Sequence, residues 1–183
     1  VCSSDLAAYE FLVPIVKGWS TEMSLNVTST GVQVHGGMGF IEETGAAQYY
    51  RDAQILTIYE GTTAIQANDL VGRKTSRDAG AVAKHFIAQV RATQAELAAS
   101  SNADLQAIAK QLALGATALE DVVNFVVANF KSDIKAVFSG SVPYLKLAGV
   151  VLGGWQLGRA ALIAEKLNAA GEGDSSFNQT KMA

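Results

Sequence analysis

The stretch IYEGTTAIQ, residues 58–66, places one carboxylate, Glu60, between an aromatic residue and a glycine, directly before a segment that can begin a helix. A carboxylate at such a junction can lie near apolar surface, where loss of hydration makes it a stronger base. Abstraction of a proton from a weak carbon acid requires such a base. A lone Tyr-Glu-Gly is more often a solvated helix cap, so the stretch becomes informative only with its neighbours.

Upstream of this stretch, the sequence predicts a long helix. Pro14 fits the first helical turn, because its missing N–H group costs nothing there. Apolar residues recur every four positions and define one face: Phe11, Ile15, Trp19, Met23 and Val27. The glycine pair Gly36-Gly37 should end the helix, since successive glycines readily take positive φ. A loop to about Gly45 is then expected.

Between that loop and the polar segment 75–80, TSRDAG, three further elements are predicted. Residues 46–53 should form a short helix and residues 55–59 an extended stretch. Another helix should begin with its N-cap at Gly61 or Thr62 and last to about residue 74. The polar segment itself ends in glycine and is the best candidate for a linker between domains.

Beyond the linker, three long helical patterns cover residues 81–99, 104–130 and 143–170. They should pack as an antiparallel bundle, with loops at 100–102 and 131–141. Small residues on the last helix would allow a close approach to its neighbours: Gly149, Gly153, Gly154, Gly158, Ala160 and Ala161. We therefore predict an all-α protein with one helical bundle over residues 7–76 and a second, antiparallel bundle over residues 80–183, whose end is the truncated start of another helix.

Composition narrows the class of protein. Of 183 residues, 49% are hydrophobic and 17% charged, which excludes a disordered chain and indicates large surfaces buried in helix packing or against absent neighbours. The net charge of −3, with no basic cluster, argues against a nucleic-acid partner. The most apolar stretch, 147–157, is flanked by Lys146 and Arg159 and is too short for the roughly 20 residues of a membrane span. We expect a soluble, cytoplasmic protein without a membrane partner.

The first six residues, VCSSDL, equal the translation of a common sequencing adapter, so they are expected to be a scar and are left out of the domain assignment. They contain Cys2, the single cysteine. One cysteine excludes an internal disulfide and a cysteine-rich metal site, and it fits a reducing compartment.

Two further motifs accompany the Glu60 stretch: QVHGGMGF at 33–40 and YYRDA at 49–53. In order and spacing, the three together resemble the C-terminal helical domain of the acyl-CoA dehydrogenases. The likeness covers roughly residues 11–74. Within the family, the chain is most similar to the bacterial, C-terminally extended members, including the 3-methylmercaptopropionyl-CoA dehydrogenase type. The remainder resembles their extra helical domain, so the chain is expected to be a fragment that is inactive alone.

The resemblance implies an FAD-dependent oxidation of the α,β bond of an acyl-CoA thioester. Glu60 would remove the α-proton while a hydride leaves the β-carbon for the flavin. The backbone N–H of Glu60, with a ribityl hydroxyl of the flavin, would stabilise the developing enolate. Tyr59 and Gly61 would contact substrate. Some family branches carry the base on an earlier helix and a small residue here, so the glutamate is informative.

The resemblance also assigns the flavin contacts. Gln33, Gly36 and Gly37 would contact the adenosine diphosphate end of an FAD held mainly by a neighbouring subunit. Without the family context, this glycine run is more often a simple helix stop. Three residues would approach the FAD of their own subunit: Thr62, Thr63 and Ala64. Thr62 can be an ordinary N-cap at the same time.

A homodimer or tetramer that passes electrons to an electron-transfer flavoprotein is implied. Two alternatives remain open: an oxygen-using acyl-CoA oxidase, and a non-catalytic family homologue that binds DNA. No metal site is expected, because His35 and His85 have no ligand partners at metal-binding spacing. Arg51 and Asp52 are expected to form a structural ion pair or cap a turn. For residues 81–170 alone, we favour a scaffold that strengthens subunit contact or covers the acyl pocket.

Overall fold

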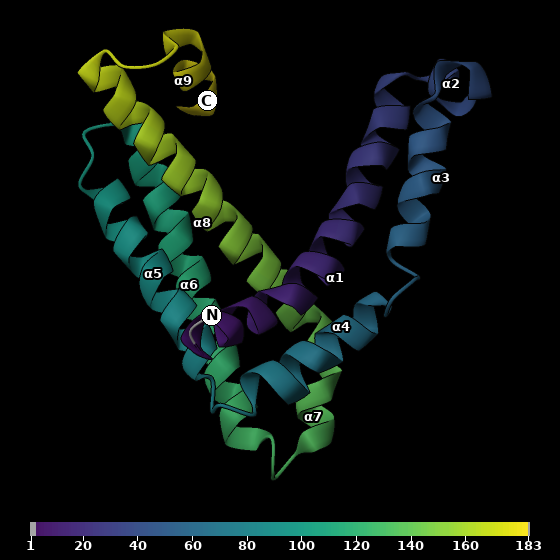
Figure 1. Ribbon diagram of the computed structural model, residues 1–183, viewed down its shortest axis with the longest axis vertical. Helices are drawn as coiled ribbons and strands as arrows, with labels where there is room; N and C mark the ends of the chain where they lie inside the picture. Colours follow the sequence, from purple (N-terminus) through teal and green to yellow (C-terminus); the bar gives the residue numbers. More distant parts are fainter. Residues whose placement is uncertain (1–2, 183) are drawn as a thin grey trace. The chain divides into compact units, whose positions relative to one another are not determined.

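The computed structural model describes residues 3–182, and all regular structure in this range is helical (Figure 1). This confirms the all-α prediction. Cys2 lies outside the described residues. The elements in chain order are α1 (Ser3–Val34), α2 (Gly37–Phe40), η1 (Glu42–Thr44), α3 (Ala46–Leu56), α4 (Thr63–Asp69), η2 (Leu70–Thr75), α5 (Ala81–Ala98), α6 (Ala103–Asn129), α7 (Ile134–Ser139), α8 (Ser141–Ala170) and α9 (Ser175–Met182).

The chain folds as two compact units, and each unit combines two segments that are separated in the sequence. One unit combines the residues up to Val82 with Phe125–Gly149, and the other combines Ala83–Asn124 with the residues from Val150 onward. The end of α6, all of α7 and the start of α8 therefore belong to the unit that contains Glu60. The boundaries predicted from sequence, 7–76 and 80–183, stay a prediction about the domains of the longer protein.

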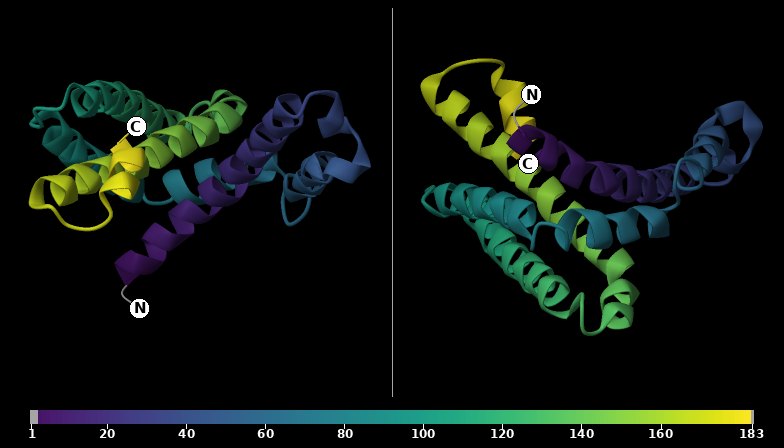
Figure 2. Two further views of the ribbon diagram at one scale, coloured as in Figure 1. Left: turned by 90° about the horizontal axis from the view of Figure 1, so that it is seen from above. Right: turned by 60° about the horizontal axis from the view of Figure 1, so that its bottom comes forward.

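In the first unit, α1 packs against α3, α4 and η2 (Figures 1 and 2). Its buried side chains include Phe11 and Ile15, as the four-residue spacing predicts. Further along, Met23 is 37% exposed and Val27 63% exposed. The apolar face is therefore covered at the start of the helix and bare toward its end.

The segment from α8 contacts the middle of α1 closely. A Cβ atom at Gly149 would collide with the Trp19 side chain, and one at Gly18 would lie 2.6 Å from Cδ2 of Leu145. Each contact is made where one of the two helices carries glycine. This confirms that Gly149 permits a close helix approach, and Trp19 packs in this contact rather than at a cofactor.

The position of Pro14 differs from the prediction. It lies inside α1 rather than in the first turn, because the helix already begins at Ser3. An interior proline removes one backbone hydrogen bond and crowds the preceding turn. Pro14 is buried between Phe11 and Ile15, and this packing offsets the loss.

The extended stretch predicted for residues 55–59 is also not observed. Helix α3 continues to Leu56, and Ile58 N and Tyr59 N both donate to Ile55 O, at 3.0 and 3.2 Å. β-branched and aromatic residues favour a strand only where a partner strand accepts their backbone hydrogen bonds. No strand is present among residues 3–182, so these groups bond within a turn.

Four short elements, α2, η1, η2 and α7, were not anticipated. The predicted loop after Val34 contains α2 and η1, and the helix expected to reach residue 74 changes to π-helical geometry at Leu70. The predicted loop 131–141 contains α7, whose N-cap Asp133 accepts a hydrogen bond from Ala136 N at 3.1 Å. Asp133 is a regular N-cap signal that could have been found in the sequence.

The second unit is an up-down-up arrangement of α5, the first part of α6 and the second part of α8. Apolar side chains of α5 and α6 form its core, with Phe86, Val90, Leu97, Leu105 and Leu119 buried. A Cβ at Gly158 would lie 3.2 Å from Leu97, so the small residue again allows a close helix approach. Trp155 is 6% exposed and its indole N–H donates to Thr93 at 2.8 Å, so it belongs to this core.

Two described helices, α6 and α8, are long and apolar enough to cross a membrane by length and composition. The apolar stretch considered from the sequence, 147–157, is shorter than the 18-residue window of α8 that passes this test. Half of the most apolar window of α8 is buried in the fold, and core helices of soluble proteins pass the same test. The absence of a membrane partner stays a prediction.

Candidate functional site: the turn that carries Glu60

Glu60 lies in the reversal between α3 and α4, and its backbone is left-handed. Its φ is 51°, and Gly61 follows with a φ of 93°. Among the described non-glycine residues, Ala79 is the other one with positive φ. A left-handed conformation costs a residue with a Cβ about 1–2 kcal/mol, and such outliers cluster at functional sites. The fold therefore maintains an unfavourable backbone at the residue that carries the carboxylate.

Lys17 of α1 forms a hydrogen bond at the start of this turn, where α3 ends. Its Nζ donates to the carbonyl oxygen of Leu56 at 2.5 Å and stands 4.9 Å from the centroid of the Tyr59 ring. Leu56 is the last residue of α3, where carbonyl groups lack intrahelical donors and a positive charge is favoured. One ammonium group thus caps the helix and fixes the aromatic side chain that precedes Glu60.

Gln66 of α4 forms a hydrogen bond near the end of the turn, at Glu60. Its Nε2 donates to the carbonyl oxygen of Glu60 at 3.3 Å. The side chain fits between two glycines, because a Cβ at Gly61 would lie 2.8 Å from Nε2 and a Cβ at Gly18 would lie 3.3 Å from Cβ of Gln66. A side chain at Gly61 would displace the Nε2 group that reaches Glu60, and one at Gly18 would crowd the base of Gln66.

The Glu60 side chain itself is exposed, and the apolar residues beside it are exposed as well. Ile58 is 55% and Ile65 58% exposed, and Tyr59 presents 45% of its surface. The turn therefore presents one carboxylate on an open apolar surface. This surface can become dry only when another molecule or another part of the protein covers it.

The start of α4 presents unpaired backbone donors next to the turn. Thr62 is the N-cap by backbone geometry, but its side chain makes no capping hydrogen bond. The first intrahelical bond runs from Gln66 N to Thr62 O at 3.0 Å, which leaves the N–H groups of Thr63 and Ala64 without an intrahelical acceptor. The hydroxyl of Thr63 donates to Oε1 of Glu22 at 2.5 Å, a partner in α1 that the sequence did not suggest.

The second group of predicted cofactor residues lies at the other end of α3. Gln33, Gly36 and Gly37 are exposed at the tip where α1 passes into α2 (Figure 1). Gly36 has a φ of 61°, and a Cβ at either glycine would meet no atom within 4 Å. The structure does not bring this group together with Glu60. Helix α3 separates them, as expected if the two groups contact different flavins.

Arg51 forms an ion pair with Glu42 at 2.7 Å, one of the two roles expected for it. Neighbouring residues on a helix point in different directions, so a partner in the preceding 3-10 turn is better placed. The ring of His35, directly after α1, contacts Gly31 O at 2.9 Å, and His85 contacts Gln89 within α5 at 2.7 Å. No group of three or more potential metal ligands occurs among the described residues.

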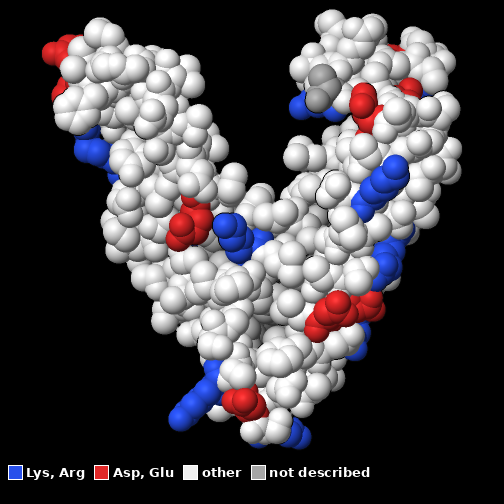
Figure 3. All heavy atoms as spheres, turned by 180° about the vertical axis from the view of Figure 1, so that it is seen from behind, with Lys and Arg blue, Asp and Glu red and all other residues white. Residues whose placement is uncertain are grey.

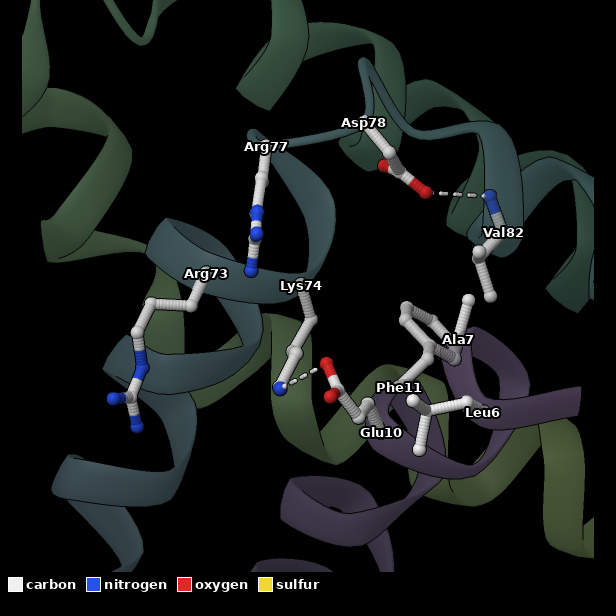
Figure 4. A pocket seen from close by; sticks show the side chains of 9 residues that line it. All are labelled: Leu6, Ala7, Glu10, Phe11, Arg73, Lys74, Arg77, Asp78 and Val82. Carbon is white, nitrogen blue, oxygen red and sulfur yellow. Dashed lines mark hydrogen bonds and ion pairs between the residues drawn. The ribbon is translucent and has the colours of Figure 1, made fainter. Parts of the chain in front are cut away.

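A hollow of about 340 Å³ opens between the start of α1 and the segment after η2 (Figure 4). Its charged side chains include Arg73, Lys74 and Arg77 together with Glu10 and Asp78. Lys74 Nζ lies 3.0 Å from Glu10 Oε2, and this hydrogen bond and charge hold the pKa of Glu10 below its usual value. The hollow does not contain Glu60, so it is not the candidate site.

The comparisons with known proteins define the class first. Residues 4–75 match the profile described as "Acyl-CoA dehydrogenase, C-terminal domain", and residues 86–183 match "Acetyl-CoA dehydrogenase C-terminal like". The second match alone covers more than half of the chain. The chain belongs to the acyl-CoA dehydrogenase family, in agreement with the resemblance of its three motifs.

Several curated relatives align along nearly the whole chain. The 3-methylmercaptopropionyl-CoA dehydrogenase of Ruegeria pomeroyi is 53% identical, over 95% of this chain and 29% of the relative. The broad-specificity linear acyl-CoA dehydrogenase FadE5 of Mycobacterium tuberculosis is 34% identical, over 95% of this chain and 30% of the relative. A butyryl-CoA dehydrogenase of Syntrophomonas wolfei is 28% identical, over 93% and 28%. The chain thus spans about three tenths of the length of these relatives.

Proposed function

We propose that this chain is the part of an FAD-dependent acyl-CoA dehydrogenase that supplies the catalytic base, Glu60. The observation that carries the proposal is the left-handed backbone of Glu60 on an open apolar turn, inside the segment that matches the dehydrogenase domain. A solvated helix cap would not need an unfavourable backbone with a side-chain hydrogen bond at each end, one of them from α1. The exposed carboxylate beside apolar side chains supports a role for Glu60 as the base.

The residues around the turn fit a flavin. Backbone donors at Thr63 and Ala64 suit an anionic or hydroxyl-rich group, and the bare glycines at 36 and 37 permit close approach of a pyrophosphate. When bound, FAD would accept the hydride from the substrate β-carbon. Glu22 beside Thr63 would orient that hydroxyl rather than bind a phosphate, because two anions repel each other.

The chemistry of this chain would be proton transfer. The Glu60 carboxylate takes the proton from the α-carbon of the thioester, while its own backbone N–H donates to the thioester oxygen and stabilises the negative charge that develops there. The left-handed conformation determines where both groups of one residue point. Tyr59 and Gly61 would line the acyl chain, whose burial removes water from the carboxylate.

The substrate class follows from the surface and from the relatives. Apolar residues stay exposed along the first unit, and charged side chains are sparse over the α1–α3 end of the face shown in Figure 3. The exposed apolar residues include Val27, Val34, Met38, Phe40, Tyr49, Ile55, Ile58 and Ile65. The rest of the enzyme and a second subunit would cover part of this surface. The 53% sequence identity with the Ruegeria pomeroyi enzyme favours 3-methylmercaptopropionyl-CoA as the first acyl-CoA to test.

Electrons would leave through an electron-transfer flavoprotein, with the protein assembled as a homodimer or a tetramer. An acyl-CoA oxidase would perform the same proton abstraction at Glu60 and differ only in reacting rapidly with oxygen. A DNA-binding homologue would not need the Glu60 geometry, and the net charge of −3 does not favour it.

The test uses the full-length flavoprotein that contains this segment. Anaerobic mixing with a panel of acyl-CoAs, including 3-methylmercaptopropionyl-CoA, should bleach the flavin absorbance with one chain class. Glu60→Gln should bind flavin normally and lose this bleaching by several orders of magnitude. Glu172→Gln, an exposed glutamate outside the turn, serves as the matched control. A Glu60→Gln enzyme that bleaches at the wild-type rate would contradict the proposal.

A further inference from the structure

We propose that Lys17 and Gln66 are positioning residues that together hold the Glu60 turn in its reactive geometry. This inference rests on the proposed role of Glu60 as the base. Gln66 ends the stretch 58–66 and Lys17 lies in α1, but the sequence alone assigned neither of them a role in the site. Neither residue needs to touch the substrate. They act on the backbone at the two ends of the turn, Leu56 and Glu60.

Lys17 stabilises the entry through two contacts of one ammonium group. The bond to Leu56 O is short, at 2.5 Å, and Lys17 is half-buried, so water competes with it less than at an exposed site. The same atom faces the Tyr59 ring at 4.9 Å, within the range of a cation–π interaction. Removing the charge would free the residue before Glu60 and leave the end of α3 without its cap.

Gln66 stabilises the exit by bonding the carbonyl of Glu60 itself. That carbonyl can point toward α4 because Glu60 is left-handed, so the bond and the unfavourable φ of 51° occur together. The bare positions at Gly18 and Gly61 enclose Gln66 and limit its rotamers. Leu145 packs closely against Gly18, since its Cδ2 would lie 2.6 Å from a Cβ at that position. The base is thus supported through α1 by a residue of α8.

The left-handed backbone of Glu60 is unfavourable for a residue with a Cβ, and the free energy gained from a single uncharged hydrogen bond is of similar size. Loss of either contact lets the turn relax toward ordinary φ. A displacement of about 1 Å at a reacting group can cost on the order of 100-fold in rate. Proton abstraction should therefore respond to Lys17 and Gln66 more strongly than folding does.

The experiment compares Lys17→Met and Gln66→Glu in the full-length flavoprotein. Gln66→Glu keeps the side-chain shape and removes the Nε2 donor, and Lys17→Met keeps the chain length and removes the charge. The limiting rate of flavin bleaching should fall about 10- to 100-fold in each, while flavin content and the acyl-CoA concentration at half-saturation stay within twofold. Lys17→Arg should recover most of the rate. Exchange of the substrate α-proton with deuterated solvent, followed by NMR, should fall in parallel.

Matched controls come from the second unit. Gln106→Glu removes the same kind of bond, from Nε2 to Ser100 O at 2.8 Å, and Lys84→Met removes an exposed lysine. Both controls should bleach at the wild-type rate. If Lys17→Met and Gln66→Glu also do so while Glu60→Gln is inactive, the positioning inference is wrong and the base assignment stands. If Glu60→Gln is active, the proposed function itself fails.

A variant that misfolds is replaced by a gentler one. Gln66→Asn shortens the side chain by one methylene group and keeps its amide, and Lys17→Gln keeps a donor without the charge. Intermediate rates with normal flavin content support the inference. Wild-type rates in both overturn it.

Discussion

The hydroxyl groups of Tyr144 and Thr75 lie 2.8 Å apart and share a hydrogen bond in the core of the unit that contains Glu60. Tyr144 is 2% exposed and Thr75 is fully buried. Tyr144 belongs to the part of the chain that matches the C-terminal-like profile, and Thr75 ends the part that matches the dehydrogenase profile. A second bond of this kind joins Ser141 to Asn68 at 2.9 Å. The two matched regions therefore share one core.

Removing one partner of the buried pair should destabilise the protein. Tyr144→Phe leaves the Thr75 hydroxyl without its partner and should lower the free energy of unfolding by about 1–3 kcal/mol. The double variant Tyr144→Phe with Thr75→Val should recover part of this loss, because neither position then carries an unsatisfied group. Chemical denaturation of the four proteins measures the coupling. A double variant that loses the sum of both single effects would contradict a direct bond.

Alkaline pH should weaken the same region. Burial, only partly offset by the Thr75 hydrogen bond, raises the pKa of Tyr144 from 10.0 to about 12. The unfolded chain releases the phenolic proton more readily, so this contribution to stability is present below pH 10 and is lost as pH rises toward 12. The loss amounts to about 3 kcal/mol. Unfolding followed by tyrosinate absorbance should show it in the wild-type protein, and Tyr144→Phe should show a flatter dependence on pH.

The contact between Gly149 and Trp19 should not tolerate a larger residue. Gly149→Ala places a Cβ against the base of the indole, which cannot move like the end of a flexible side chain, and should lower the free energy of unfolding by about 1–3 kcal/mol. Gly31→Ala is the matched control in α1, since a Cβ there meets nothing within 4 Å. It should raise stability by up to about 1 kcal/mol, because alanine favours a helix. Thermal unfolding of both variants checks the contrast, and equal melting temperatures would refute it.

The glutamate at position 60 should lower the stability of the fold while being required for activity. Glu60→Gly removes the cost of the left-handed backbone and should raise the free energy of unfolding by about 1 kcal/mol, while flavin bleaching by acyl-CoA is lost. Ala79→Gly is the comparison, because Ala79 has a similar φ of 55° but lies in the linker. It should gain similar stability and keep full activity. A Glu60→Gly protein that is less stable than wild type would show that the turn is not strained.

Helix content and much of the core could be predicted because they depend on spacing along the chain. Phe86, Val90 and Leu97 lie on one helical face in the sequence and are buried together in the structure. Met23 and Val27 follow the same spacing yet are exposed, because spacing defines an apolar face but does not determine what packs against it.

The candidate site was predictable only as a residue, not as a geometry. Glu60 stood out by its motif, but the motif did not reveal its positive φ or the hydrogen bonds of Lys17 and Gln66 at the two ends of the turn, and Lys17 lies far away in the sequence. Arg51 shows the same limit, since an ion pair was one expected role but its partner Glu42 was not identified from the sequence. Side chains that meet across helices leave no periodic signal.

The shared use of Phe125–Gly149 has a consequence for how such enzymes can be divided or shortened. A protein cut in the linker at residues 75–80 would lose the wall formed by Leu145, Tyr144 and Gly149, although the two profiles meet near that point. The C-terminal extension is therefore not a detachable module. A minimal enzyme would have to keep this segment, for instance by splicing it behind Val82, or replace the bare surface of α1 with polar residues.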